Sequence, residues 1–174
     1  MSNRIGILTV SDSAARGESE DRSGPLLLEL IHGLIPDAEV RLGVVADDRG
    51  AIARRLKSWA DDDDLALILT TGGTGLAPRD VTPEATLDVI ERQAPGIAEA
   101  IRAAGLNTTP HAMLSRGVAG VRGRTLIINL SGSPKAVREQ FDVIRPVLLH
   151  ALELVRPGDA GIRHAREGEH RREA

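Results

Sequence analysis

The feature that most constrains this chain is a short apolar run followed directly by a glycine-rich loop. Residues 65–71 read LALILTT and show no alternation of apolar and polar side chains. Such a run is typical of a strand that is buried on both faces, as in a parallel sheet. Gly72, Gly73 and Gly75 follow at once, and glycine permits positive φ angles and a close approach of the backbone to a ligand. The segment predicts a central strand with a ligand-binding loop at its carboxyl end.

The second half of this loop carries charged groups. Arg79 and Asp80 lie in it, and Pro83 then opens a predicted helix, with Thr82 as its N-cap and Glu84 in its first turn. Backbone amides, a guanidinium and a carboxylate in one loop are suited to binding phosphate. Each charge also has a simpler interpretation: Asp80 could form an Asx turn or pair with Arg79, and Arg79 could be a surface charge.

The remaining sequence alternates between strand-like and helix-like stretches. Residues 112–124, with three glycines, are expected to form a short edge hairpin, and Pro146 is expected to kink the last helix. This order predicts an α/β fold with three layers, in which a mostly parallel, doubly wound sheet carries helices on both faces. Further strands are expected at residues 4–10, 38–46 and 125–130, and helices at residues 24–34, 52–59, 84–93, 95–104 and 134–155.

One domain is the natural interpretation of 174 residues, and it is expected to span residues 1–156. Residues 157–174 are charged and lack apolar periodicity, so they are expected to form a mobile tail. No run approaches the ~20 apolar residues of a membrane span, and no signal sequence precedes the first strand. A cytoplasmic protein without a membrane partner is expected.

Composition excludes several classes of site. The chain contains no cysteine, so a disulfide, a thiol nucleophile and a cysteine-bound metal are excluded. The five histidines do not cluster, which argues against zinc. Ser11, Ser115 and Ser131 have no nearby histidine or nucleophile elbow, which argues against a hydrolase triad. The formal net charge is −3 with both signs interspersed, so a nucleic-acid partner is not expected.

In a parallel sheet the carboxyl ends of the strands share one edge, so the polar residues that follow them should meet. Ser11 and Asp12 follow the first strand, and Asp47 and Asp48 follow the second. Asp47 could instead cap the next helix, although Asp48 is better placed for that role. Two carboxylates beside a phosphate would repel it, so Mg²⁺ is expected at Asp47 and Asp80, bound together with substrate phosphates.

A further loop, Ser131 to Pro134, follows the strand at 125–130. Ser133 and Pro134 open a helix whose free amides and dipole make an anion site, with an ordinary N-cap as the simpler alternative. Generic nucleotide motifs do not fit. The loop at 72–80 lacks the terminal Gly-Lys-Ser/Thr of a P-loop, and no GxGxxG follows the first strand.

Several motifs, in matching order, resemble the molybdopterin adenylyltransferase family of molybdenum-cofactor biosynthesis, which includes the closely similar B-type proteins. They are TTGGTG and RDVTPEAT within residues 70–86, Asp47 after the second strand, LSRGVAG at 114–120 and a Gly-Ser-Pro turn at 132–134. The likeness runs from Arg4 to about Leu154. The segment in which RDVTPEA follows TTGGTG is the most specific of these motifs.

The resemblance implies a molybdopterin-binding domain that is commonly a homotrimer and that binds ATP and molybdopterin. The terminal phosphate of molybdopterin would attack the α-phosphate of ATP, giving adenylyl-molybdopterin and pyrophosphate with Mg²⁺ present. A downstream molybdenum-insertion protein is an implied partner. A non-catalytic molybdopterin-binding or carrier protein of the same fold is the alternative, and a different nucleotide-processing enzyme on this fold is a third hypothesis.

By the same resemblance, Asp47 and Asp80 are the functional aspartates. Three positions depart from the family pattern: Ser131 and Ala46 each stand where proline is usual, and Ser13 stands where arginine often follows Ser-Asp. The first change is expected to loosen its turn and the last to remove a phosphate contact. The full set of expected substrate-binding residues is Ser11, Asp12, Thr71, Gly72, Gly73, Thr74, Gly75, Arg79, Thr82, Ser131, Gly132, Ser133 and Pro134.

Overall fold

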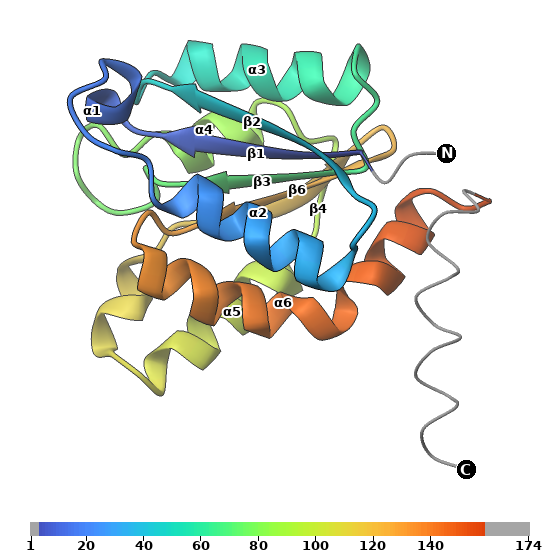
Figure 1. Ribbon diagram of the computed structural model, residues 1–174. Coiled ribbons are helices and arrows are strands. Elements are labelled where there is room, and N and C mark those ends of the chain that lie inside the picture. The colour runs from blue at the N-terminus through green and yellow to red at the C-terminus, as the bar shows by residue number, and fades with distance from the viewer. Residues whose placement is uncertain (1–3, 159–174) are drawn as a thin grey trace.

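A six-stranded sheet with the strand order β2-β1-β3-β6-β5-β4 forms the centre of the molecule (Figure 1). The computed structural model describes residues 4–158. Strands β2, β1, β3 and β6 run parallel, while β5 runs antiparallel to β6 and to β4. The strands are β1 (Arg4–Val10), β2 (Glu39–Val45), β3 (Leu67–Thr71), β4 (Arg92–Gln93), β5 (Ala119–Arg122) and β6 (Thr125–Leu130).

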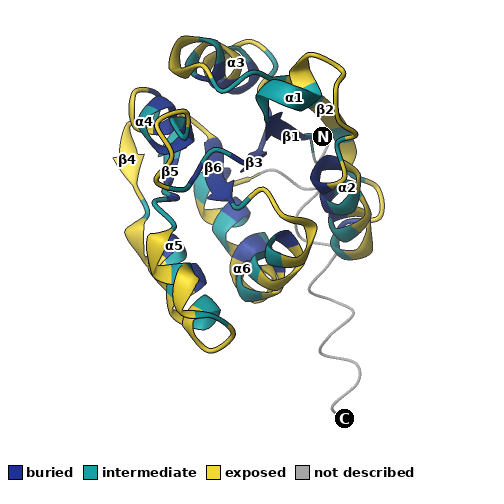
Figure 2. Ribbon diagram, turned by 90° about the vertical axis from the view of Figure 1, so that its left-hand side faces the viewer, coloured by how far each residue is buried: buried dark blue, intermediate teal, exposed yellow. Residues whose placement is uncertain are grey.

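Helices cover both faces of this sheet, which confirms the predicted three-layer α/β fold (Figures 1 and 2). α2, α5 and α6 pack on one face, and α3 and α4 pack on the other. The helices are α1 (Asp12–Ala15), α2 (Ser23–Leu34), α3 (Arg49–Asp61), α4 (Thr82–Leu87), α5 (Pro95–Leu106), the 3₁₀ helix η1 (Pro110–Leu114) and α6 (Pro134–Val155).

The central strands are buried on both faces because each alternate side chain meets a different helical layer. Along β1, Ile5 and Ile7 join the core beneath α2 and α6, whereas Leu8 and Val10 join the core beneath α3. All five residues of β3 are buried, as its uninterrupted apolar run predicts. The core is almost entirely aliphatic, since Phe141 and Trp59 are the only aromatic side chains that it contains within residues 4–158.

The predicted helix at residues 84–93 is wrong at its C-terminal end. α4 stops at Leu87, and the chain then turns to pair as β4 with β5. The amides of Glu91 and Ala94 donate to carbonyls of β5, so pairing with the sheet replaces further helical hydrogen bonds. The edge hairpin expected within 112–124 is wrong, because this stretch contributes only the strand β5, which lies between β6 and the edge strand β4.

Thr82 is not an N-cap, contrary to the sequence prediction. It is the first residue of α4, and Val81 occupies the capping position. The Thr82 hydroxyl donates instead to the carbonyl of Gly72, 2.9 Å away, which fastens the start of the helix to the glycine loop.

The C-terminal helix is continuous through Pro146 and ends at Val155. The tail expected at 157–174 falls outside the described residues apart from its first two positions, so it stays a prediction. No helix within residues 4–158 combines the length and the apolar character that a membrane span requires.

A buried amide joins the two halves of the sheet near the loops. Asn129 in β6 donates to the hydroxyls of Thr70 and Thr86, both at 2.9 Å, and its carbonyl oxygen accepts from the amide of Val118 at 3.2 Å. The side chain therefore links β3, α4 and the approach to β5 at a point where water cannot replace its hydrogen bonds.

Replacing Asn129 with alanine should lower the free energy of unfolding by about 2–3 kcal/mol, because it leaves the buried Thr70 and Thr86 hydroxyls without a donor and the Val118 amide without an acceptor. Chemical denaturation measures this change. Asn107→Ala is the matched control, since Asn107 is exposed at the end of α5 and its loss should cost under about 0.5 kcal/mol. Equal costs at the two positions would contradict the assigned role of the buried network.

Candidate functional site

The loops that follow β1, β2, β3 and β6 meet at one edge of the sheet, as their parallel arrangement predicts. The hydroxyl of Thr71 donates to the carbonyl of Ser131 at 2.8 Å, and the amide of Gly72 donates to the carbonyl of Leu130 at 3.2 Å. A Cβ atom built on Gly132 would lie 3.2 Å from the Cα of Gly72. The glycine loop and the 131–134 turn therefore touch through their backbones.

Asp12 and Asp47 hold the ends of β1 and β2 together through a reciprocal pair of hydrogen bonds. The amide of Asp12 donates to Oδ2 of Asp47 at 2.7 Å, and the amide of Asp47 donates to Oδ1 of Asp12 at 3.0 Å. Each carboxylate is thus oriented by the other residue's backbone. Asp48 caps α3 by accepting from the amide of Ala51, which confirms that Asp47 is left for another role.

Arg79 reaches back from the glycine loop to Asp12. Its Nε and Nη2 atoms donate to the two carboxylate oxygens of Asp12 at 2.7–3.0 Å, and these bonds lower the pKa of Asp12. The pairing of Asp80 with Arg79 that the sequence left open is therefore not what forms. Asp80 instead accepts a hydrogen bond from the amide of Ala77 at 2.9 Å, which closes a local turn.

Asp47 and Asp80 lie in neighbouring loops at this edge, near enough for the charge of Asp80 to act on Asp47. Burial raises the pKa of Asp47 above its ordinary value, and the negative charges of Asp12 and Asp80 add to the rise. The amide of Asp12 and the charge of Arg79 oppose it. The net result is that the Asp47 carboxylate is harder to ionise than usual, beside the Asp12 carboxylate that pairs with Arg79. A cation here would relieve that cost.

The glycine loop is shaped by contacts that no side chain would allow. Gly72 has φ +102° and Gly73 has φ +63°. A Cβ on Gly72 would overlap the carbonyl oxygen of Val10, and one on Gly73 would overlap the Thr82 hydroxyl and lie 3.1 Å from Oδ1 of Asp47. The bare backbone therefore lets β1, β2 and the loop converge around Asp47.

The turn after β6 is held more firmly than its sequence suggests. Ser133 caps α6 by accepting from the amide of Ala136 at 3.2 Å, which confirms the N-cap interpretation. The amide of Ser131 donates to Oε1 of Gln140, and Nε2 of Gln140 donates to the hydroxyl of Ser131, both at 2.8 Å. The expectation that Ser131 loosens this turn is wrong, because a proline could not make the first of these bonds.

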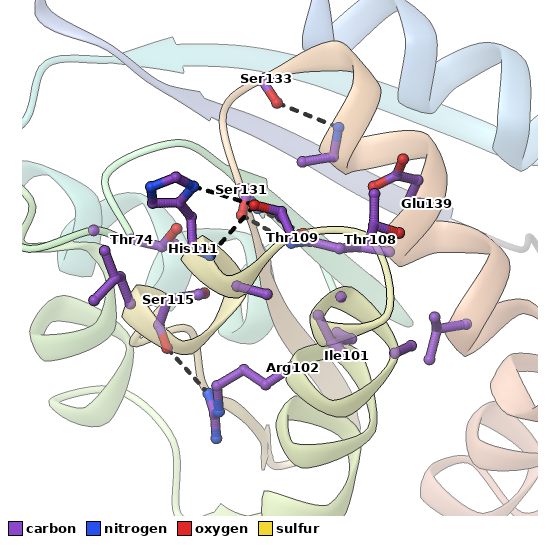
Figure 3. Close-up of a pocket in the computed structure, with 18 residues that line it drawn as sticks. Thr74, Ile101, Arg102, Thr108, Thr109, His111, Ser115, Ser131, Ser133 and Glu139 are labelled. Carbon is purple, nitrogen blue, oxygen red and sulfur yellow. Dashed lines mark hydrogen bonds between the residues drawn. The ribbon is translucent and has the colours of Figure 1, made fainter.

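A cavity of about 550 Å³ opens beside this edge, between α5, η1 and α6 (Figure 3). Thr74, Gly75, Ser131 and Ser133 of the predicted residues line it. Its other walls come from residues that the sequence analysis did not select: Ile101, Arg102, Ala104, Gly105, Thr108, Thr109, His111, Ala112, Leu114, Ser115, Ala136, Glu139, Gln140 and Val143. The one motif of the sequence analysis that reaches these walls is LSRGVAG, whose first two residues, Leu114 and Ser115, line the cavity.

A smaller cavity of about 260 Å³ lies on the other side of the glycine loop, beside β1 and the start of α2. Five predicted residues line it: Ser11, Thr71, Gly72, Gly132 and Pro134. The remaining predicted residues, Asp12, Asp47, Gly73, Arg79, Asp80 and Thr82, line neither cavity. Gly73 lies close to Oδ1 of Asp47, so Asp47 is beside the glycine loop. In the sequence, Gly73 stands between Gly72, which lines the smaller cavity, and Thr74, which lines the larger one.

Two serines near the end of β1 have local structural roles. Ser11 caps α1 by accepting from the amide of Ala14, and Ser13 shares hydrogen bonds with Ser11 and Ser19 at 3.2 and 2.8 Å. Ser13 thus belongs to a hydroxyl cluster where the family pattern has arginine. Among residues 4–158, no group of three or more histidine, aspartate or glutamate side chains is arranged to hold a metal ion.

Asp47→Asn should stabilise the fold at neutral pH, because the native environment penalises the ionised carboxylate. A raised pKa means that this penalty is absent below the ordinary value of about 3.9 and fully present above the raised value. The melting temperature of the variant should therefore exceed that of the wild type at pH 7, and the difference should vanish towards pH 3. Thermal unfolding across this range measures it. Asp48→Ala should instead destabilise the protein through loss of its cap. A lower melting temperature for Asp47→Asn at pH 7 would contradict the electrostatic analysis.

Comparison with known proteins agrees with this architecture. The family described as "Probable molybdopterin binding domain" matches residues 6–150. The molybdenum cofactor synthesis protein cinnamon of Drosophila melanogaster is 44% identical over 151 residues, which make up 87% of this chain but 25% of that protein. The molybdopterin adenylyltransferase of Helicobacter pylori strain J99 is 41% identical over 152 residues, covering 87% of this chain and 86% of that enzyme.

Solved structures show the same arrangement. The molybdopterin biosynthesis enzyme MoaB of Thermus thermophilus has a TM-score of 0.82 at 54% identity, covering 87% of this chain and 95% of that one. The molybdopterin biosynthesis Mog protein of Mycobacterium ulcerans has a TM-score of 0.82 at 41% identity, covering 87% of this chain and 97% of that one. From the family match, these relatives and the shared fold, the chain belongs to the molybdopterin-binding-domain family of molybdenum-cofactor biosynthesis.

Proposed function

We propose that this protein is a molybdopterin adenylyltransferase, which transfers AMP from ATP to the terminal phosphate of molybdopterin and releases pyrophosphate. The observation that carries the proposal is the convergence, at one edge of the sheet, of the loops after β1, β2, β3 and β6, on which Asp47 and Asp80 stand. Relatives that bear this name are about 40% identical over most of the chain. Transfer to phosphate needs positioning and charge stabilisation rather than a protein nucleophile, which suits a site without cysteine.

The two cavities suggest how the substrates would divide the site. We assign the larger one, of about 550 Å³, to the pterin of molybdopterin, because a bulky heterocycle needs that volume. The smaller one, of about 260 Å³, would hold the nucleoside. Gly72 in one wall and Thr74 in the other would bring the reacting phosphates together over the glycine loop. The amides that begin α6 would bind phosphate at the same junction.

Asp47 and Asp80 fit a magnesium ion as a donor set. They supply two carboxylates, which is the number that Mg²⁺ commonly takes from a protein when phosphates complete its shell. Burial is the main cause of the raised pKa of Asp47, and the negative charges of Asp12 and Asp80 add to it; a bound cation would favour the ionised carboxylate. When bound, such an ion would neutralise charge on the phosphates. The protein's own part is to hold the two carboxylates in place, through the amides of Asp12 and Ala77.

The test is pyrophosphate release from ATP in the presence of molybdopterin and Mg²⁺. Asp80→Asn should reduce the rate by about 10²-fold or more, because the transition-state charge loses its carboxylate-held counterion. Asp88→Asn is the control, since Asp88 pairs with Arg49 on the surface and should leave the rate unchanged. Tight binding of molybdopterin without pyrophosphate release would sink the transfer activity and support a carrier. Absence of molybdopterin binding would move the assignment to another nucleotide enzyme.

We further propose that the protein is a cytoplasmic homotrimer and that its product passes to a molybdenum-insertion protein. Several large apolar side chains are exposed, and contact between copies would cover some of them; they include Leu42, Val44, Leu106, Met113, Leu114, Val147 and Leu154. Light scattering of the purified protein should give the mass of three chains. A monomer at micromolar concentration would contradict the assembly without affecting the proposed reaction.

A further inference from the structure

Arg116 makes more contacts to the glycine loop than any residue selected from the sequence. Its own amide donates to the carbonyl of Thr74 at 2.9 Å. In its guanidinium, Nε donates to the carbonyl of Gly75 at 2.7 Å and Nη2 donates to the carbonyl of Asp80 at 2.6 Å. The remaining nitrogen, Nη1, forms an ion pair with Glu84 in the first turn of α4.

These contacts close the neck of the loop, which is otherwise held by Arg79 bound to Asp12 and by Thr82 bound to Gly72 and Gly73. Residues 76–79 are exposed and form no helix or strand. Gly75 and Asp80 stand on either side of this exposed segment, and one planar guanidinium joins their carbonyl groups. Arginine suits this task because its donors have a fixed geometry, which a flexible ammonium lacks. Arg116 therefore holds the carbonyl groups of Gly75 and Asp80 at a fixed separation.

The orientation of the Asp80 carboxylate depends on this neck. Its Oδ2 accepts from the amide of Ala77 across the exposed segment, and a Cβ on Gly75 would lie 2.8 Å from the same oxygen. Both contacts are local, so they require the two ends of the segment to stay together. If the neck opened, the turn that aims Asp80 would be free to rearrange.

Glu84 completes the arrangement from the helix side. Its Oε2 atom is buried and has no hydrogen-bond partner within the described part of the chain. Burial by itself raises the pKa of Glu84, but the hydrogen bond from Arg116, together with the backbone and nearby positive charge, brings the pKa below its ordinary value. The carboxylate therefore stays ionised and needs the arginine, which ties the loop to α4.

We propose that Arg116 is a positioning residue, which fixes the glycine loop so that the Asp80 carboxylate points at the substrate phosphates. The proposal rests on the proposed function, because the orientation of Asp80 matters for a rate only if Asp80 acts in the reaction. Arg116 itself lines neither cavity, so it acts through the loop and not by touching substrate.

Arg122 provides a matched control. It is also an arginine beside the hairpin, pairs with a carboxylate, Asp61, at 2.6–2.9 Å, and donates to a carbonyl, that of Val89, at 3.0 Å. It contacts no residue of the glycine loop among its recorded hydrogen bonds. Arg122→Ala therefore removes a comparable set of interactions while leaving residues 74–80 as they are.

The experiment combines amide hydrogen exchange with steady-state kinetics on Arg116→Ala, Arg116→Lys and Arg122→Ala. The amides of Ala77 and Asp80, which are hydrogen-bonded in the folded loop, should exchange about tenfold faster or more in both Arg116 variants. Their kcat for pyrophosphate release should fall by about 10²-fold for alanine and less for lysine, since small misplacements carry that cost. The KM for molybdopterin should stay within about threefold. Arg122→Ala should change neither exchange at 74–80 nor kcat.

Unchanged exchange at Ala77 and Asp80, or equal loss of kcat in Arg122→Ala, would overturn the proposal and leave Arg116 a structural residue. Full activity of Arg116→Lys with fast exchange in the loop would also overturn it. If Arg116→Ala does not fold, the lysine variant carries the same comparison. A wild-type protein that releases no pyrophosphate would refute the proposed function, and the positioning role with it, whereas the exchange data would still report separately on the loop.

Discussion

The constraint on which this site depends is the close approach of three backbones at the carboxyl edge of the sheet. Gly72 lies so close to the carbonyl of Val10 that a Cβ would overlap it, and a Cβ on Gly132 would be in tight contact with the Cα of Gly72. Because the strands β1, β3 and β6 are adjacent and parallel, their following loops are brought to this point by the sheet itself. Each loop then needs only a local turn to bring its polar groups close to those of the neighbouring loops.

This convergence places several negative charges together, and the fold compensates for them with arginines and amides. Asp12 is matched by Arg79, and Asp47 and Asp12 accept from each other's amides. Even so, the pKa of Asp47 remains raised, mainly by burial and further by the charges of Asp12 and Asp80. A site that is fully neutralised by its own side chains would have little to offer a cation and its phosphates. In the free protein, ionised Asp47 therefore lowers the stability of the fold, and the proposed binding of a cation would remove this cost. Such a loss of stability is common at functional sites.

Most of the framework could be predicted from sequence because it rests on local and periodic signals. The uninterrupted apolar run of β3 predicts a strand that is buried on both faces, and the polar residues after β1 and β2 are predicted to share its edge. What failed were features decided by distant pairing. α4 ends early because Glu91 pairs with Val121 of β5, and the Thr82 hydroxyl leaves its expected cap because Gly72 offers it a carbonyl. Likewise, the contacts of Arg116 with Gly75 and Asp80 depend on a separation of 36–41 residues that no local pattern records.

The turn at Ser131 is held by hydrogen bonds that a proline at this position would not allow in full. Proline at this position would stabilise the fold by lowering the conformational entropy of the unfolded chain. Serine restores an amide and adds a hydroxyl, and both are used by Gln140, which lies on the second turn of α6 and points back to the loop. Two hydrogen bonds at a partly buried position contribute about 1 kcal/mol each, comparable to the entropic advantage of proline. The turn is therefore held by the contact between Ser131 and Gln140. As a result, the wall of the larger cavity at this point depends on the helix as well as on the loop.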